Sequence, residues 1–368
     1  MENPLNQEFI HPLKLFEVAK NEKRLLYTSA PMLAFRQTVH HYGTDLCWTP
    51  MILAKEFNRN KFARDSDFTI STAGPQPPTI VQFGANVPQE LARASSLVVP
   101  FASGVDLNCG CPQSWACSST LGAALMEKRE LVRDMVLETR SQLHQDGWDV
   151  SGLEKDINSP KGRSVSIKIR VHKDLRKTID FITTLLAPCS LTTTRPIDFL
   201  TIHPRTRQTP SSTPINVESL SILTSTFGTQ VPILLSGDVF TLDSLPFTSP
   251  FHNTLSSSSS PPEHNIPHLS GLMSARALLA NPALFSGRNS CPWEAVEYFL
   301  NKTIKAPMPF KLVLHHINEM CSPGMGPSQK DKVALLNKQE RAELMKVGDM
   351  VELIDFLEEK KPGGIGRM

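Results

Sequence analysis

The chain has 368 residues, of which 40% are hydrophobic and 20% charged, and its formal net charge at pH 7 is +2. This length is enough for one large domain of about 200–250 residues and a smaller one. A charge this close to neutral excludes a protein that attracts nucleic acid through a global basic field, so any RNA contact has to come from a local patch.

Eight short apolar runs have the length and residue types of β-strands, and helix-like stretches separate most of them. The runs cover roughly residues 25–31, 46–52, 79–84, 103–109, 164–170, 199–204, 231–236 and 271–275. Between them, 128–147 and 173–187 carry apolar residues at helical spacing. This alternation predicts an α/β fold, a (β/α)8 TIM barrel. A doubly wound open sheet is the alternative, but no G-x-G-x-x-G motif follows the first run.

Two polar stretches interrupt the alternation, and a third region ends it. Residues 151–163 are polar, and residues 247–269 contain a serine run followed by two prolines, so we expect flexible surface insertions at both. Beyond residue 290 only helical segments are expected, at 292–303, 308–320 and 334–359. We therefore predict a barrel domain over 1–290 and a helical domain over 291–368.

Polar side chains occur where several of the expected strands end. The strand at 103–109 leads into a Gly-Cys-Pro sequence, which delivers Asn108 and Cys111 to the rim of the sheet, where barrel enzymes carry out their chemistry. Gln82 stands among apolar neighbours near the end of an earlier strand, where a satisfied polar group is the simpler interpretation.

Lys168 and His203 follow on the next two strands. Alternation puts Lys168 on one face with Ser166 and Arg170, and an ammonium inside a barrel is costly unless a ligand compensates it. A lysine that reaches solvent at the strand end is the alternative. His203 is followed by Arg205 and Arg207, an expected anion-facing rim, although a lone histidine is more often structural.

The last two strands end in Ser236-Gly237-Asp238 and Ser274-Ala275-Arg276. In barrels of this type the loops after the seventh and eighth strands form a phosphate site from backbone N–H groups and a helix N-terminus. Gly237 permits a close backbone approach, and Arg276 can add charge-assisted hydrogen bonds.

These segments resemble, in their order along the chain, the motifs of the tRNA-dihydrouridine synthase family. The matching segments are 30–32, 48–51, 81–84, 106–112, 167–170, 202–207, 237–238 and 273–276. Together they cover about residues 25–290, and the string Cys-Gly-Cys-Pro-Gln-Ser-Trp-Ala at 109–116 is most similar to the eukaryotic branch that acts at positions 20a and 20b of the tRNA D-loop.

The resemblance implies an FMN-dependent enzyme that reduces uridine in the D-loop of tRNA to 5,6-dihydrouridine with NADPH as reductant. It implies that the flavin is surrounded by Pro31, Met32, Leu33, Gln82, Asn108, Lys168, His203, Ser236, Gly237, Asp238, Ala275 and Arg276. It also makes Cys111 the general acid that protonates carbon 5 while reduced flavin gives hydride to carbon 6. A thiol of ordinary pKa, about 8.5, is mostly protonated at neutral pH and can serve this role. The helical domain would help to hold tRNA.

Three departures from the family pattern accompany these matches. Pro204 stands where glycine is usual, Ser236 where asparagine is usual, and residues 117–120 lack the acid and glycine common after the catalytic cysteine. Two other functions stay open: a flavin oxidoreductase acting on a free pyrimidine, and a non-catalytic RNA-binding protein on a decayed barrel.

The remaining features concern the environment of the protein. The seven cysteines have neither the even spacing of a disulfide framework nor a finger-like pairing for zinc, so we expect a reduced protein without a metal site. The N-terminus lacks the pattern of a secretory signal, and no apolar run reaches membrane-spanning length. We therefore expect an intracellular protein, cytoplasmic or nuclear, that is a monomer without a membrane partner.

Overall fold

The strands close into a single barrel in the computed structural model, which describes residues 9–29, 33–68, 76–188, 195–247, 266–326 and 333–361. Eight parallel strands form it: β1 (Leu26–Ser29), β2 (Leu46–Trp48), β4 (Thr79–Gly84), β5 (Gly104–Cys109), β6 (Ser164–Arg170), β7 (Leu200–His203), β8 (Ile233–Ser236) and β9 (Leu269–Ser274). Each pairs with the next in this order, and β9 pairs with β1. The short β3 (Ile52–Leu53) adds to the end of β4. The TIM barrel predicted from the sequence is confirmed.

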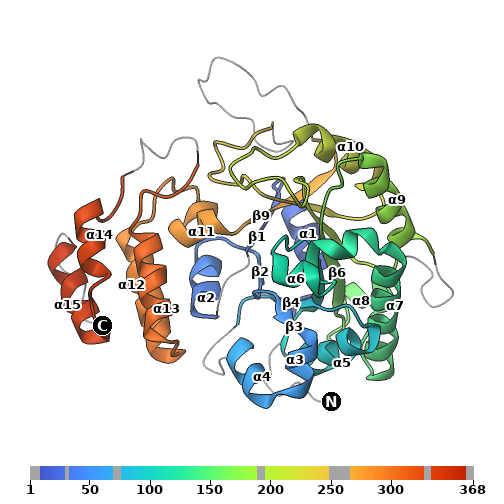
Figure 1. The fold of residues 1–368 in the computed structure, drawn as a ribbon, viewed down its shortest axis with the longest axis horizontal. Coiled ribbons are helices and arrows are strands. Elements are labelled where there is room, and N and C mark those ends of the chain that lie inside the picture. The colour runs from blue at the N-terminus through green and yellow to red at the C-terminus, as the bar shows by residue number, and fades with distance from the viewer. Residues whose placement is uncertain are drawn as a thin grey trace.

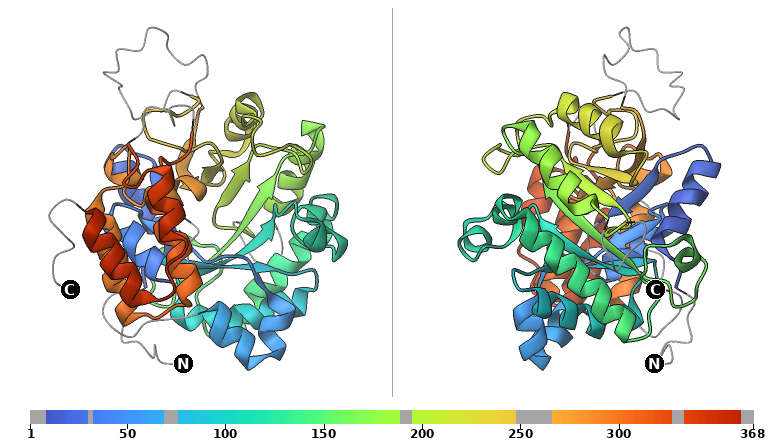
Figure 2. Two further views of the ribbon diagram at one scale, coloured as in Figure 1. Left: turned by 60° about the vertical axis from the view of Figure 1, so that its left-hand side comes forward. Right: turned by 90° about the vertical axis from the view of Figure 1, so that its right-hand side faces the viewer.

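Helices surround the barrel and then continue to one side of it (Figures 1 and 2). They are α1 (Pro12–Asn21), α2 (Leu33–His41), α3 (Ala54–Arg59), α4 (Lys61–Asp67), α5 (Pro88–Val98), α6 (Ser114–Ser118), α7 (Arg129–Gln145), α8 (Glu154–Ile157), α9 (Leu175–Leu186), α10 (Val217–Phe227), α11 (Arg276–Ala280), α12 (Trp293–Lys305), α13 (Phe310–Met320), α14 (Lys338–Leu344) and α15 (Met350–Lys360), with 3-10 turns η1 (Val99–Phe101), η2 (Gly122–Glu127) and η3 (Leu284–Ser286). None of the helices in these described ranges is long and apolar enough to cross a membrane.

The interior of the barrel changes from apolar to polar along its axis. One cluster of buried side chains joins the strands to α1: Leu13, Phe16, Leu26, Trp48, Ile80, Phe199, Leu234 and Met273. On β4, β5 and β6 the next positions on the inward face are polar, with Gln82 level with Asp106 and Asp106 level with Ser166. Asn108 is in turn level with Lys168. The carboxyl ends of these strands therefore form a polar end of the barrel, opposite the end that α1 closes.

The stretch 151–163 has a defined conformation that its polar composition does not predict. It contains α8, and the Asp156 carboxylate accepts hydrogen bonds from the hydroxyl of Ser151 and the backbone N–H of Gly152. Arg163 is buried and donates from Nε to the carbonyl of Val99 at 3.1 Å. The serine-rich stretch expected at 247–269 lies, from 248 to 265, outside the described residues.

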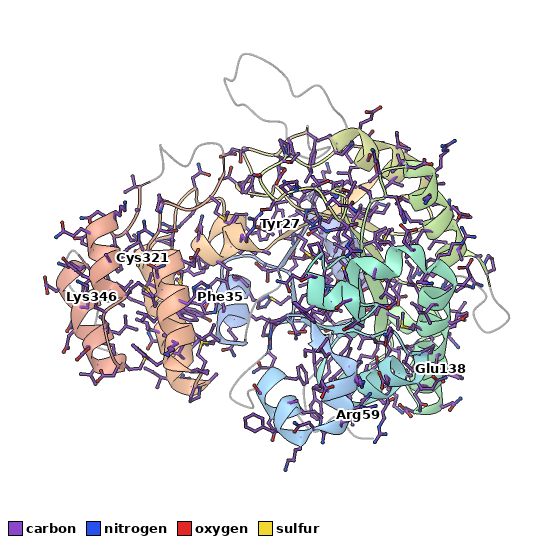
Figure 3. The ribbon with its side chains drawn as sticks, viewed as in Figure 1. Tyr27, Phe35, Arg59, Glu138, Cys321 and Lys346 are labelled. Atoms are coloured by element: carbon purple, nitrogen blue, oxygen red, sulfur yellow. The ribbon has the colours of Figure 1, made fainter. Side chains whose placement is uncertain are left out.

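The C-terminal helices pack against α2. Phe35 on α2 lies beside the C-terminal helices (Figure 3). Its ring lies 5.9 Å from the Phe299 ring of α12 and stacks at 4.8 Å on His316 of α13. The single helical segment expected at 334–359 is instead two helices, because the Asp349 carboxylate accepts the N–H groups that start α15. One apolar core continues from α2 into α12 and α13, so the structure does not mark a separate domain at 290. The predicted domain boundary stays a prediction.

This packing makes Phe299 a test of how firmly the tail is joined to the barrel. Phe299→Ala is expected to lower the free energy of unfolding by about 3–5 kcal/mol, the usual cost of a cavity left by a buried phenylalanine. Ile304→Ala, on the same helix but 60% exposed, is the control and should change it by less than about 0.5 kcal/mol. Chemical denaturation measures both. A change of less than about 1 kcal/mol for Phe299→Ala would mean that α12 is only loosely attached.

Candidate active site

A hydrogen-bonded chain of side chains runs across the polar end of the barrel from β4 to β6. Gln82 Nε2 donates to the Asp106 carboxylate at 2.7 Å, and Asn108 Nδ2 donates to Gln82 Oε1 at 2.8 Å. The Ser166 hydroxyl donates to Asp106 at 2.6 Å. Burial raises the pKa of Asp106 to about 6, although these hydrogen bonds oppose the shift. The chain fixes the side chains of Gln82 and Asn108 in one orientation.

Asn108 also holds the loop that carries the predicted catalytic cysteine. Its Oδ1 accepts the backbone N–H groups of Gly110 and Cys111, each at 2.9 Å. The Cys111 carbonyl accepts the N–H of Ala123 at 2.9 Å. Gly122 has φ +58°, and a Cβ there would lie 2.7 Å from the Cys111 Cβ, so only glycine fits this position. The half-buried Cys111 is thus tied to both β5 and η2.

Cys109 and Cys111 lie in different surroundings even though they are two residues apart. Cys109 is the last residue of β5 and is fully buried in the large apolar core. Burial raises its pKa well above that of an ordinary thiol. Cys111 lies beyond the strand, so the period-two alternation that would put both on one face no longer applies there.

Lys168 lies on the inward face of β6, and its ammonium group has no hydrogen-bond or ion-pair partner among the described residues. Its pKa is lowered to about 8 by burial and, next, by Arg170, against the opposing charge of Asp106. Thr201 is level with it on β7, and its buried hydroxyl also lacks a partner in the described part of the chain. Two adjacent unsatisfied polar groups fit a ligand that offers carbonyl or anionic atoms. Lys168 is half-buried, so both contact with a ligand and contact with solvent are open to it.

The residues after β7 are arranged differently from the anion-facing rim expected at 203–207. Arg205 turns inward, where it is 3% exposed, and donates to His203 Nε2 at 3.0 Å and to the Asp238 carboxylate at 2.6 Å. Burial and then the nearby cations, Lys168 first, lower the pKa of His203 to about 2, so its imidazole is neutral. Arg207 alone stays exposed at the rim. The expectation for Arg205 was wrong because two acceptors are within its reach.

The predicted phosphate loop has the backbone shape that the sequence suggested. Gly237 has φ +112°, and a Cβ there would lie 2.9 Å from His203 Nε2. The Asp238 carboxylate is already occupied by Arg205 and by the N–H of Ile215 at 2.8 Å, so this residue can offer only its backbone to a ligand. Ser236 is half-buried at the end of β8.

The other predicted cofactor residues are divided between the surface and the part of the chain that the structure does not describe. Ala275 and Arg276 are exposed at the start of α11, and the charge of Arg276 is among the causes that lower the pKa of His203. Pro31 and Met32 lie outside the described residues, and Leu33 begins α2 with its side chain undescribed.

Two of the departures from the family pattern have defined contacts in the structure. Pro204 is buried, and its carbonyl accepts the N–H of Asn216 at 2.8 Å. In the loop after Cys111, the Cys117 thiol points at the Cys111 carbonyl at 3.6 Å. Asn86 donates to the Ser119 carbonyl at 2.8 Å. The altered loop is therefore held close to Cys111.

Two features of the site were not predicted: the place of Asp106 in it and the inward pairing of Arg205. Asp106 precedes Asn108 by two positions on β5, so strand alternation already put both on one face. Arg205 joins His203 to Asp238, which are distant in the sequence, and no local pattern indicates that pairing. The first could have been found from the sequence and the second could not.

Comparison with known proteins agrees with this geometry. Residues 29–347 match the family model described as dihydrouridine synthase (Dus). The chain is 31% identical to the human tRNA-dihydrouridine(20a/20b) synthase (NAD(P)+)-like protein, over 94% of this chain and 93% of that one. It is 34% identical to the tRNA-dihydrouridine(20a/20b) synthase (NAD(P)+) of Schizosaccharomyces pombe, over 95% and 91% of the two chains. Over 84% of this chain and 83% of the other, it is also 34% identical to a mouse tRNA-dihydrouridine(20a/20b) synthase (NAD(P)+)-like protein. This chain belongs to the dihydrouridine synthase family.

Proposed function

We propose that this protein is an FMN-dependent enzyme that reduces uridine in the D-loop of tRNA to 5,6-dihydrouridine, with NADPH as reductant. The observation that carries the proposal is the arrangement at the polar end of the barrel, where Asn108 holds the loop of Cys111 and Lys168 lies unmatched beside it. The names of the relatives, which specify positions 20a and 20b, support the D-loop as the target.

The barrel residues fit a flavin mononucleotide. Bound FMN would supply a two-electron hydride donor for the double bond of uracil. The Lys168 ammonium and the Thr201 hydroxyl, both without partners among the described side chains, would meet the polar edge of its ring system. Gly237 allows the chain to pack closely against His203, and the exposed Arg276 is available to a phosphate.

Cys111 would act as the general acid. Addition across the 5,6 double bond of uracil requires a proton at carbon 5, and a positioned thiol can donate it. Cys111 donates its N–H to Asn108 Oδ1 and accepts the N–H of Ala123 at its carbonyl, so its backbone is held from two sides, which would position the residue for that transfer. The pKa of His203 is lowered to about 2, so its imidazole is neutral and does not compete as an acid at this end of the barrel.

The two alternative functions fit less well. A non-catalytic protein on a decayed barrel has no need for the complete Gln82–Asp106–Asn108 hydrogen-bonded chain or for a buried lysine without a partner. A reductase of free pyrimidines has no need for the exposed indole described below. We also propose that the protein acts as an intracellular monomer and that α12–α15 help to hold tRNA.

The test of this function is the dihydrouridine content of tRNA from cells that lack the protein. We expect dihydrouridine to disappear from a D-loop position in these cells and to return when the wild-type chain is supplied. An unchanged modification pattern in cells confirmed to lack the protein would contradict the proposal.

Trp115 offers a prediction about substrate binding. It lies on α6 four residues after Cys111, is 47% exposed, and its indole N–H donates to Gln113 Oε1 at 2.6 Å, which fixes the ring. Exposed aromatic rings next to RNA sites stack on unpaired bases, at about 1–3 kcal/mol per base. Trp115→Ala is expected to raise the KM for tRNA by about 10-fold or more, and Trp115→Phe by much less.

Steady-state kinetics with varied tRNA provide the measurement, and the rate of NADPH oxidation without tRNA is the control. That rate should be equal in wild type and both variants, because Trp115 is exposed on α6 and is not one of the predicted flavin residues. Equal KM values for tRNA in wild type and Trp115→Ala would remove Trp115 from the RNA site.

A further inference from the structure

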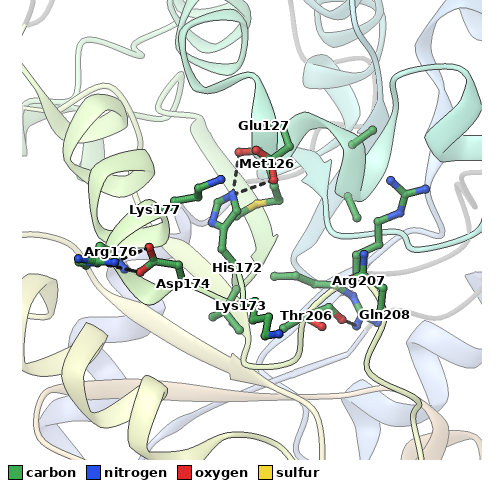
Figure 4. Close-up of a pocket in the computed structure, with 14 residues that line it drawn as sticks. Met126, Glu127, His172, Lys173, Asp174, Arg176, Lys177, Thr206, Arg207 and Gln208 are labelled. Atoms are coloured by element: carbon green, nitrogen blue, oxygen red, sulfur yellow. Dashed lines mark hydrogen bonds and ion pairs between the residues drawn. The ribbon is translucent and has the colours of Figure 1, made fainter.

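A second site is built beside the Cys111 loop, on the outer rim of the barrel. It is a pocket of about 1080 Å³ between η2, the segment that follows β6 and the segment that follows β7 (Figure 4). It is lined by Ala123, Ala124, Met126, Glu127, Arg170, Val171, His172, Lys173, Asp174, Arg176, Lys177, Thr206, Arg207 and Gln208. Its volume is at the upper end of the range for small-molecule sites, about 300–1,000 Å³.

The wall of the pocket is joined directly to the proposed active site. Arg170 donates from Nε to the carbonyl of Gly110 at 2.9 Å and from Nη1 to the carbonyl of Thr206 at 2.7 Å. Ala123, on the opposite wall, donates its N–H to the Cys111 carbonyl. A ligand that fills the pocket therefore lies against the backbone of the reacting loop.

The pocket carries an excess of positive charge that its own side chains do not neutralise. Five of its side chains are cationic and two are acidic. Asp174 pairs with Arg176, at 3.0 Å, as Figure 4 shows. The described residues give Lys173, Lys177 and Arg207 no ion-pair partner, and all three are exposed. Three free cations from two different segments that face one concavity are suited to a ligand with more than one phosphate.

The remaining lining is rigid and partly apolar. The His172 ring is fixed in orientation, because its Nδ1 bonds to the Thr178 hydroxyl and its Nε2 to the Met126 carbonyl, each at 3.0 Å. Met126 and Val171 are buried and form an apolar wall with two alanines. The pocket thus combines a fixed apolar wall, which suits a flat base, with mobile cations, which suit phosphates.

We propose that this pocket binds the adenosine and phosphate half of the reducing dinucleotide, with Lys177 and Arg207 on its phosphates. The inference rests on the proposed function, since it supplies the reductant for that reaction. An RNA phosphate is the competing occupant. The concave shape favours a small ligand, and α9, which carries Lys177, lies across the barrel from α12–α15, the helices proposed to hold tRNA (Figures 1 and 2).

Binding of 2′,5′-ADP to the flavin-loaded protein, followed by isothermal titration calorimetry, tests the proposal without any redox readout. The double variant Lys177→Ala with Arg207→Ala should bind 2′,5′-ADP at least about 10-fold more weakly than wild type. The matched control removes two exposed lysines from α1 and α8, Lys14→Ala with Lys155→Ala, and should bind as wild type does. Circular dichroism checks that both double variants are folded.

The outcomes separate the occupants and the two proposals. Unchanged 2′,5′-ADP affinity in the folded Lys177/Arg207 variant overturns the assignment. So does an unchanged 2′,5′-ADP affinity combined with weakened tRNA binding, which assigns the pocket to RNA. If 2′,5′-ADP binding is lost as predicted but the wild-type protein forms no dihydrouridine in tRNA, the pocket stands and the proposed function fails.

Discussion

Cys111→Ala is expected to lower dihydrouridine formation by about 10²–10⁴-fold, the usual effect of removing a general acid. Flavin binding and the reduction of flavin by NADPH should persist, because the Asn108 hydrogen bonds to this loop come from backbone N–H groups and survive the substitution. Mass spectrometry of nucleosides from treated tRNA measures the first effect. The bleaching of flavin absorbance on addition of NADPH measures the second.

Cys109→Ala is the matched control, because it removes the same chemical group two residues away. The Cys109 thiol is buried in the core and faces away from the polar end of the barrel, so its loss should cost about 1 kcal/mol of stability and leave the reaction rate nearly unchanged. If Cys109→Ala abolishes the reaction and Cys111→Ala does not, the reacting thiol has been assigned two residues too late.

Lys168→Ala is expected to weaken FMN binding by about 10-fold or more, because it removes a charge-assisted contact inside the barrel. The ionisation of Lys168 also predicts how the affinity for FMN changes with pH. In the ligand-free barrel the pKa of Lys168 is lowered to about 8, so the ammonium form is present below pH 8 and is lost above it. FMN affinity of the wild-type apoprotein should therefore fall between about pH 7 and 9.5, and that fall should be absent in Lys168→Ala.

Quenching of flavin fluorescence across this pH range measures the affinity. Lys161→Ala is the matched control, because Lys161 is exposed near the opposite end of β6 and should keep the wild-type pH profile. A Lys168→Ala protein that keeps both the affinity and its pH dependence would show that the ammonium does not contact the flavin.

The barrel itself could be predicted because each strand has a local sequence signal, a short apolar or alternating run. The run at 164–170 alternates and matches β6 residue for residue, and the run at 79–84 matches β4. The break between α14 and α15 was missed because an Asp capping a new helix after Gly348 resembles the interior of a longer polar helix in sequence.

The candidate site could be predicted only in part, for a physical reason. Alternation put Lys168 on one face with Ser166 and Arg170 but left open whether it lies inside the barrel or reaches solvent, and Asn108 was expected at the rim beside Cys111. Arg205 was misplaced because its inward turn depends on Asp238, 33 residues later, and only the closed barrel brings the two together. The cationic pocket combines η2, α9 and the segment after β7 in the same way, so no single stretch of sequence reveals it.

Reduction of uridine in tRNA by the purified protein can be measured in one reaction. Purified flavin-loaded protein is incubated with NADPH and unmodified tRNA transcript, and the nucleosides are then analysed by mass spectrometry with Cys111→Ala protein in parallel. We expect dihydrouridine from a D-loop fragment with wild-type protein and almost none with the variant. Unmodified uridine throughout, from wild-type protein whose flavin NADPH demonstrably reduces, would contradict it.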